Sequence, residues 1–104
     1  MTAPERTDDG RWIVVDGRRW RAEDPSLDAD AAARLRSHLG RARSAVRNAE
    51  DDAAREAARD RVQLAKEGLG ERGDHWWDLA PAERAARASD RLAALDSLAP
   101  PAAR

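Results

Sequence analysis

The chain has 104 residues, of which 24 are alanine and 18 are arginine, and its formal charge at neutral pH is −1. This length fits a single domain, because two separate hydrophobic cores require a longer chain. The sequence contains no cysteine and no apolar run near the ~18 residues that a membrane span needs. Composition therefore excludes a disulfide-stabilised fold and a helical membrane protein, and it predicts a soluble, cytoplasmic domain.

The N-terminal part of the chain predicts an arm followed by a β-hairpin. Residues 1–10 are polar and have no hydrophobic period, so we expect them to form a disordered arm. Residues 11–22 contain two β-prone runs separated by Asp16 and Gly17. This pair is typical of a two-residue type I′ turn, in which both residues need a positive φ.

A two-residue turn also determines which side chains share a face of the hairpin. It places Ile13 opposite Trp20, and the alternation of side chains puts Val15 on the same face. We expect this face, including Trp20, to lie in the core. The other face carries Trp12 and Arg21, close enough for the guanidinium to stack on the indole.

Three helices are expected after the hairpin. Apolar residues recur every three or four positions over about 28–48 and again over about 51–69. Two such stripes with a seven-residue period predict an antiparallel helical hairpin with an alanine-rich, coiled-coil-like seam. Pro81 suits the first turn of a third helix over about 81–98, and 99–104 is expected to be a tail.

The predicted fold is mainly α and forms a single domain over 11–98. An N-terminal β-hairpin packs on the long antiparallel helical hairpin, followed by a loop rich in tryptophan and the third helix. A two-stranded hairpin is marginally stable in water unless its apolar face is covered. We therefore expect one of Trp76 and Trp77 to be buried against the hairpin or the helices, and the other to be partly exposed.

Residue types that carry catalysis are scarce. There is no cysteine, the serines lack a nucleophile-elbow motif, and His38 has no identifiable catalytic partner. Asp74, His75 and Asp78 lack the spacing that is typical of zinc sites. The glycines of 68–73 match a dinucleotide fingerprint, but they follow a helix rather than a strand, so helix termination explains them better. We predict a protein that is not an enzyme and holds no metal or cofactor.

The tryptophans and arginines indicate two kinds of partner. Tryptophan is enriched at interaction hot spots, so the candidate partner-binding residues are Trp12, Trp76 and Trp77, and the partner is a protein or a second copy of this chain. The alternative is a nucleic-acid-binding protein, because arginine beside exposed tryptophan suits phosphates and unstacked bases. The candidate phosphate-binding residues are Arg18, Arg19, Arg21, Arg36, Arg43 and Arg47.

Acidic residues argue against this alternative. An antiparallel hairpin brings the acidic start of the second helix beside the end of the first helix, where Arg43 and Arg47 lie. We therefore expect these charges to neutralise one another, with acids at a helix N-terminus and arginines at a C-terminus. The preferred function is thus a small, non-enzymatic interaction or assembly module.

Two sequence motifs resemble those of a known family. The first is Asp-Gly-Arg-Arg-Trp-Arg-x-x-Asp-Pro at 16–25, and the second is Leu-Gly-Glu-Arg-Gly-x-x-Trp-Trp at 69–77. With the helical hairpin between them, they are similar to a family of small uncharacterised bacterial proteins, some of which are automatically labelled "biopolymer transporter Tol". The resemblance covers about residues 11–78. It implies membership of a family but no activity, and it carries no catalytic or ligand residue onto this chain.

Overall fold

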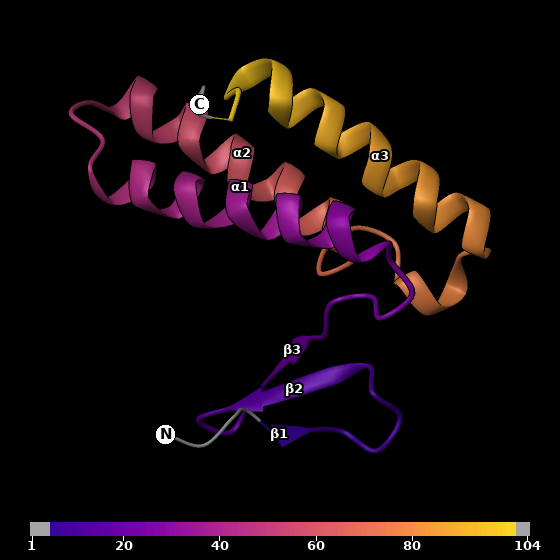
Figure 1. Cartoon of the computed structure of the whole chain (residues 1–104). Coiled ribbons are helices and arrows are strands. Elements are labelled where there is room, and N and C mark those ends of the chain that lie inside the picture. The colour runs from indigo at the N-terminus through magenta and orange to yellow at the C-terminus, as the bar shows by residue number, and fades with distance from the viewer. Residues whose placement is uncertain (1–4, 102–104) are drawn as a thin grey trace.

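The computed structural model describes residues 5–101 and shows a three-stranded antiparallel sheet followed by three long helices (Figure 1). The strands are β1 (Glu5–Arg6), β2 (Trp12–Val15) and β3 (Arg18–Arg21), and the helices are α1 (Ala29–Arg47), α2 (Asp52–Leu69), the short 3-10 helix η1 (Trp76–Asp78) and α3 (Pro81–Leu98). The predicted mainly α fold, with an N-terminal hairpin and an antiparallel helical hairpin, is confirmed.

The turn and the register of the β2–β3 hairpin are as predicted. Asp16 has φ 51° and Gly17 has φ 78°, so both lie in the left-handed region that a type I′ turn requires. Ile13 pairs with Trp20, and Trp12 pairs with Arg21. The local chemistry of the turn is therefore enough to set every pairing in the hairpin.

The segment before the hairpin differs from the disordered arm predicted for 1–10. Glu5–Arg6 forms β1, which pairs antiparallel with β2. Thr7 secures the connection, because its N–H donates to the Trp12 carbonyl at 2.9 Å and its Oγ1 accepts from the Trp12 N–H at 3.2 Å. This third strand adds main-chain hydrogen bonds that a polar segment makes as readily as an apolar one. Residues 1–4 lie outside the described residues.

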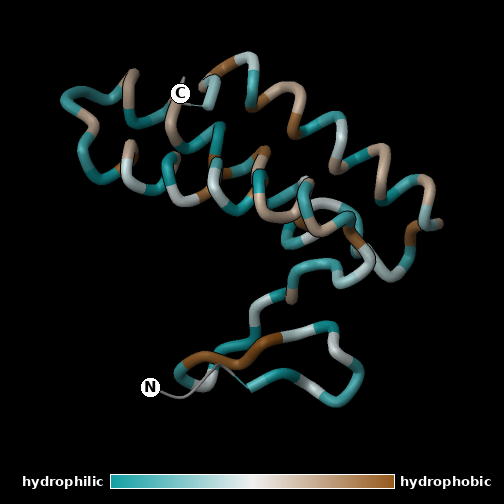
Figure 2. Tube along the Cα trace, in the orientation of Figure 1, coloured by the Kyte–Doolittle hydropathy of each residue, from teal (hydrophilic) through white to brown (hydrophobic). Residues whose placement is uncertain are grey.

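The three long helices share one hydrophobic core. Leu35 and Ala42 of α1 and Ala65 of α2 are fully buried in the alanine-rich seam, and α3 adds Leu92 and Leu95. Figure 2 shows hydrophobic residues recurring along the helices and a continuous hydrophobic stretch along β2. No helix within residues 5–101 combines the length and the apolar character needed to cross a membrane.

The helix ends follow from local hydrogen bonding. Asp28 accepts from the N–H of Ala31 at 3.0 Å, and Asp51 accepts from the N–H of Ala54 at 2.7 Å. These acids satisfy backbone donors that have no partner inside the helix. At the other end of α2, Gly70 adopts φ 89° as the C-cap. The glycine-rich segment therefore ends the helix, as predicted.

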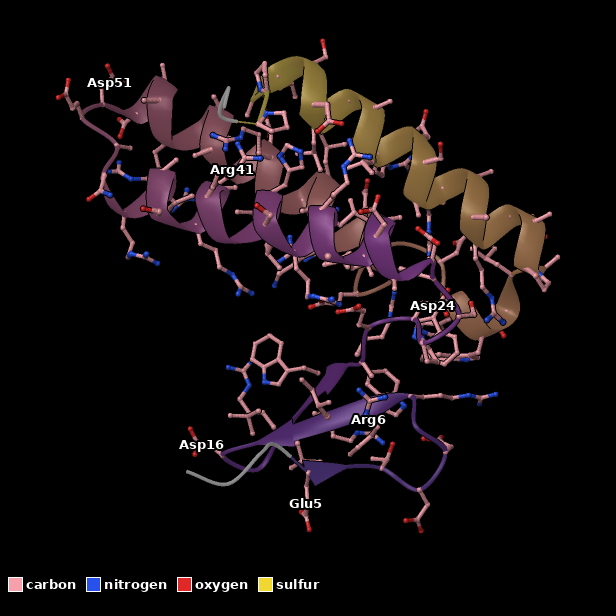
Figure 3. All side chains as sticks on the ribbon, in the orientation of Figure 1. Glu5, Arg6, Asp16, Asp24, Arg41 and Asp51 are labelled. Atoms are coloured by element: carbon pink, nitrogen blue, oxygen red, sulfur yellow. The ribbon has the colours of Figure 1, made fainter. Side chains whose placement is uncertain are left out.

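The sheet is joined to the helices at a junction of segments far apart in sequence. The indole N–H of Trp76 donates to the Ala22 carbonyl at 3.0 Å, and the Asp24 N–H donates to the Leu69 carbonyl at 2.9 Å. Figure 1 shows the sheet set apart from the helical layer, and Figure 3 shows Asp24 where the linker from the sheet reaches η1. Close packing between elements joins strand to strand and helix to helix, so the junction carries the attachment.

The sheet face that was expected in the core is instead largely open. Trp20 is 44% exposed and Val15 is 40% exposed, so the prediction that Trp20 lies in the core is wrong. It is the opposite face that is covered, since Trp12 packs edge-on against Trp77 with ring centroids 5.6 Å apart. Side-chain alternation determines which residues share a face, but the position of Trp77 decides which face is buried.

Candidate functional site

Trp76 is a structural residue of the junction. It is only 8% exposed, and the guanidinium of Arg84 lies 5.3 Å from its ring centroid. Arg84 also lies 3.6 Å from the carboxylate of buried Asp24. Gly70 packs so closely that a Cβ there would come within 3.0 Å of the indole. Trp76 therefore fills the junction and does not present a surface to a partner.

Trp12, His75 and Trp77 form an aromatic cluster beside this junction. The ring of Trp77 stacks on His75 at 4.5 Å and 19°, and it meets Trp12 edge-on at 63°. Both indoles are half-buried. The prediction that one of Trp76 and Trp77 is buried while the other is partly exposed is confirmed. The cluster therefore covers one face of the sheet.

Arginines of β3 surround the aromatic cluster, but not in the predicted arrangement. The guanidinium of Arg19 lies 4.9 Å from the centroid of Trp12, where Arg21 was expected. Arg21 instead donates to the carbonyl of Gly73 at 2.7 Å and lies 6.0 Å from the centroid of Trp77. A charge-assisted hydrogen bond from a guanidinium to a carbonyl is stronger than stacking of the guanidinium on an indole ring. Arg21 thus belongs to the attachment of the sheet.

The other arginines predicted to bind phosphate do not gather on one surface. Arg18 lies on the opposite face of the sheet from Arg19. Arg36 forms an ion pair with a carboxylate of the linker between the sheet and α1. Arg43 and Arg47 lie on the second half of α1. The structure therefore separates the six candidates into several environments.

The expected neutralisation of Arg43 and Arg47 by the acidic start of α2 does not occur. Asp51 caps its own helix, and Asp52 pairs with Arg55 of the same helix at 3.1 Å. Within the described part of the chain, neither Arg43 nor Arg47 forms an ion pair. The acids serve the N-terminus of α2 itself, where backbone N–H groups and the helix dipole stabilise negative charge.

Arg43 and Arg47 instead belong to a hollow of about 480 Å³ between α1 and α2. We term it the basic hollow, and its lining residues are Arg43, Val46, Arg47, Arg59, Val62 and Arg72. Sequence reasoning missed Arg59 and Arg72. The sequence indicated only that these two residues are basic. Which arginines lie close together depends on how α2 is rotated against α1.

A buried histidine ties α1 to α3. His38 is 1% exposed, and its Nε2 lies 2.7 Å from Oδ1 of Asp96. Arg41 donates to Nδ1 at 3.0 Å, which leaves Nε2 as the nitrogen that donates to the carboxylate. Arg34 pairs with the same carboxylate. Both imidazole nitrogens are thus engaged in hydrogen bonds within the fold. The sequence could not predict the bond to Asp96, because the two residues are 58 positions apart.

The polar residues of the loop before α3 remain dispersed. His75 Nδ1 and Asp78 Oδ2 lie 3.5 Å apart on an exposed surface. Among residues 5–101, no three histidine, cysteine, aspartate or glutamate side chains gather closely enough to hold a metal ion.

Comparison with protein-family models found no match, and neither did comparison with curated proteins or with solved structures. The family resemblance of the motifs at 16–25 and 69–77 therefore stays a prediction. Both motifs lie at the junction, where Asp24 bonds to Leu69 and Trp76 bonds to the chain just before Asp24. Residues of both motifs therefore attach the sheet to the helices.

Proposed function

We propose that this chain is a small, non-catalytic protein-interaction module that docks its partner on the open face of the N-terminal sheet. The observation that carries this proposal is the exposure of Trp20, which is 44% accessible in a chain with four tryptophans. Tryptophan is the residue type most enriched at interaction hot spots. The other three tryptophans are half-buried or buried.

The strand register defines this docking face. Cross-strand partners lie on the same side of a sheet, and neighbours along a strand lie on opposite sides. The docking face therefore consists of Arg6, Ile13, Val15, Arg18 and Trp20. Val15 and Trp20 are two of the three exposed large hydrophobic residues of the described chain. Clustering of this kind marks an interaction surface more strongly than isolated exposed residues do.

Charge decides what kind of partner fits. The guanidinium of Arg18 lies 4.6 Å from the centroid of Trp20, and Arg6 lies across from Ile13. The strand positions of the docking face carry these two positive charges and no acid. A partner segment with apolar side chains flanked by carboxylates complements this surface. A second copy would instead place arginine against arginine, because a two-fold interface opposes like patches.

The surroundings of the docking face favour a narrow partner segment. Figure 3 shows Glu5 pointing away from the helices. Glu5 lies across from Val14, on the side opposite Ile13 and Trp20, so the docking face is turned toward the helical layer. A short peptide segment reaches such a face more easily than a broad globular surface.

Peptide arrays provide the direct test. We expect the labelled protein to bind peptides in which leucine or tryptophan is flanked by aspartate and glutamate, and to ignore lysine-flanked versions. Trp20→Ser and Arg18→Gln should each abolish this binding while melting curves show that the protein stays folded, because both side chains lie outside the core. Leu98→Ser removes the exposed large apolar residue of α3 and should bind normally.

Binding that survives Trp20→Ser, or that is lost equally in Leu98→Ser, would show that the docking face is not the interaction site. Selection of lysine-flanked peptides would contradict the charge complementarity. The cytoplasmic location and the absence of catalysis stay predictions from the sequence.

A further inference from the structure

The basic hollow concentrates positive charge on a surface separate from the docking face. Its four guanidinium groups come from three segments, with Arg43 and Arg47 on α1, Arg59 on α2 and Arg72 just after α2. The residues that line it include no carboxylate. All four arginines are exposed to solvent.

These arginines lack the partners that other arginines of the chain have. Ion pairs bind arginines on each of the three long helices to carboxylates. In the described part of the chain, Arg43, Arg47 and Arg59 take part in no such pair. Arg72 donates to the neutral amide of Gln63. In the described residues, the four arginines of the hollow are therefore not held in ion pairs.

The charge of the hollow also acts on a neighbouring lysine. Burial lowers the pKa of Lys66, and the positive charge of Arg72, with a smaller contribution from Arg43, lowers it further. Glu71 raises the pKa of Lys66, while burial raises the pKa of Glu71 itself and the charges of Lys66, Arg43 and Arg72 lower it. An anion in the hollow would reduce the repulsion among the arginines that line it.

We propose that the basic hollow binds the sugar-phosphate backbone of a single-stranded nucleic acid. Guanidinium groups match phosphate oxygens through paired hydrogen bonds, and they stay charged at every physiological pH. Arg43 and Arg47 are one helical turn apart, which corresponds to about 6 Å along the axis of α1. Charges spread at this spacing suit successive phosphates of a chain better than one isolated phosphate.

The shape of the hollow favours a single strand. Packed helix axes lie roughly 8–10 Å apart, so a groove between two of them is too narrow for a duplex. Val46 and Val62 contribute apolar surface among the arginines, on which a sugar or an unstacked base can lie. The inference does not rest on the docking face, because the two surfaces share no residue.

Fluorescence anisotropy with a fluorescein-labelled oligouridylate of about 12 nucleotides tests this inference. Each phosphate neutralised on a single strand contributes about −0.7 to the slope of log affinity against log salt, so four arginines predict a slope of about −3. Affinity should therefore fall about 20-fold between about 50 and 150 mM salt. No binding at the lower salt concentration, or binding without salt dependence, would overturn the proposal.

Matched variants assign the binding to the hollow. Arg43→Gln with Arg47→Gln should weaken binding about tenfold at low salt and halve the slope. Arg36→Gln with Arg55→Gln removes the same charge from arginines that are ion-paired in this structure, and it should have a much smaller effect. Melting curves of both pairs confirm folding. An equal loss in both pairs would show that net charge alone drives binding and would overturn the assignment to the hollow.

Further experiments distinguish a single strand from other ligands and the basic hollow from the docking face. Polyglutamate that competes as well as the oligonucleotide would show that the hollow takes acidic protein segments, and a duplex that binds as tightly would refute single-strand selectivity. Trp20→Ser should leave oligonucleotide binding unchanged. Loss of binding in this variant would move the nucleic-acid site to the sheet and overturn the assignment to the hollow.

Discussion

Replacing Trp76 with alanine should unfold the protein at physiological temperature. The side chain is 8% exposed, and a buried tryptophan removes about 150–250 Å² from water, which at about 25 cal/mol per Å² is worth about 4–6 kcal/mol. Truncation also leaves the buried Ala22 carbonyl without its indole donor. We expect a loss of about 4–5 kcal/mol, close to the whole free energy of unfolding of a marginal domain.

Urea denaturation and thermal melts measure this effect. For a chain of this size, such a loss lowers the melting temperature by about 15–30 °C. Trp76→Phe keeps most of the ring but not the hydrogen bond, and it should cost about 1–2 kcal/mol. Trp20→Ala is the control, because its side chain is 44% exposed and donates no buried hydrogen bond within the described residues, so its loss should cost clearly less than the loss of Trp76. If Trp20→Ala destabilises the protein more than Trp76→Ala, then Trp76 is not the residue that fills the junction.

Three further predictions concern single residues. Gly17→Val should destabilise the protein by about 1 kcal/mol or more in thermal melts, because β-branched residues tolerate the φ of 78° poorly, and an unchanged melting temperature would contradict the turn type. His38→Ala should cost about 2–3 kcal/mol in urea, since it removes a fully buried ring and its two hydrogen bonds, whereas a loss below about 0.5 kcal/mol would show that the cluster is not structural. Burial raises the pKa of Glu71 above its ordinary 4.5. Protonation of Glu71 therefore stabilises the folded state at acidic pH, and this contribution to the free energy of unfolding is lost as pH rises through the folded-state pKa. Glu71→Gln should therefore be more stable than the parent protein at neutral pH, with the difference shrinking on acidification, and the opposite trend in denaturation midpoints would refute this.

Local signals in the sequence were sufficient for most of the fold. The turn at Asp16 and Gly17 determined the register of β2 and β3 because positive φ at two successive positions admits one hairpin geometry. The apolar stripes predicted α1 and α2 because the seam residues repeat with the helical period. β1 was missed because its two polar residues gain only backbone hydrogen bonds, which leave no hydropathy pattern.

The candidate site was less predictable because it depends on contacts between distant segments. Alternation along β2 could not show that Trp12, rather than Trp20, is covered by another side chain. That choice depends on Trp77, which lies 65 positions after Trp12 in the sequence. The basic hollow similarly depends on how α2 rotates against α1, and no spacing within either helix records that rotation. Arg59 was therefore not among the predicted residues.

The junction between the sheet and the helices also sets the order in which the structure opens and closes. Its hydrogen bonds from Arg21 and from Trp76 span 52 and 54 residues, so attaching the sheet closes a long loop of chain. Closing such a loop costs entropy that the helices, built on local contacts, do not incur. The sheet should thus behave as a cooperative unit that exchanges its amide hydrogens through local opening, while the seam of α1 and α2 exchanges only on global unfolding. A peptide bound on the docking face would slow amide exchange in β2 and β3 and leave the helical amides unaffected. Hydrogen exchange would thus detect docking directly.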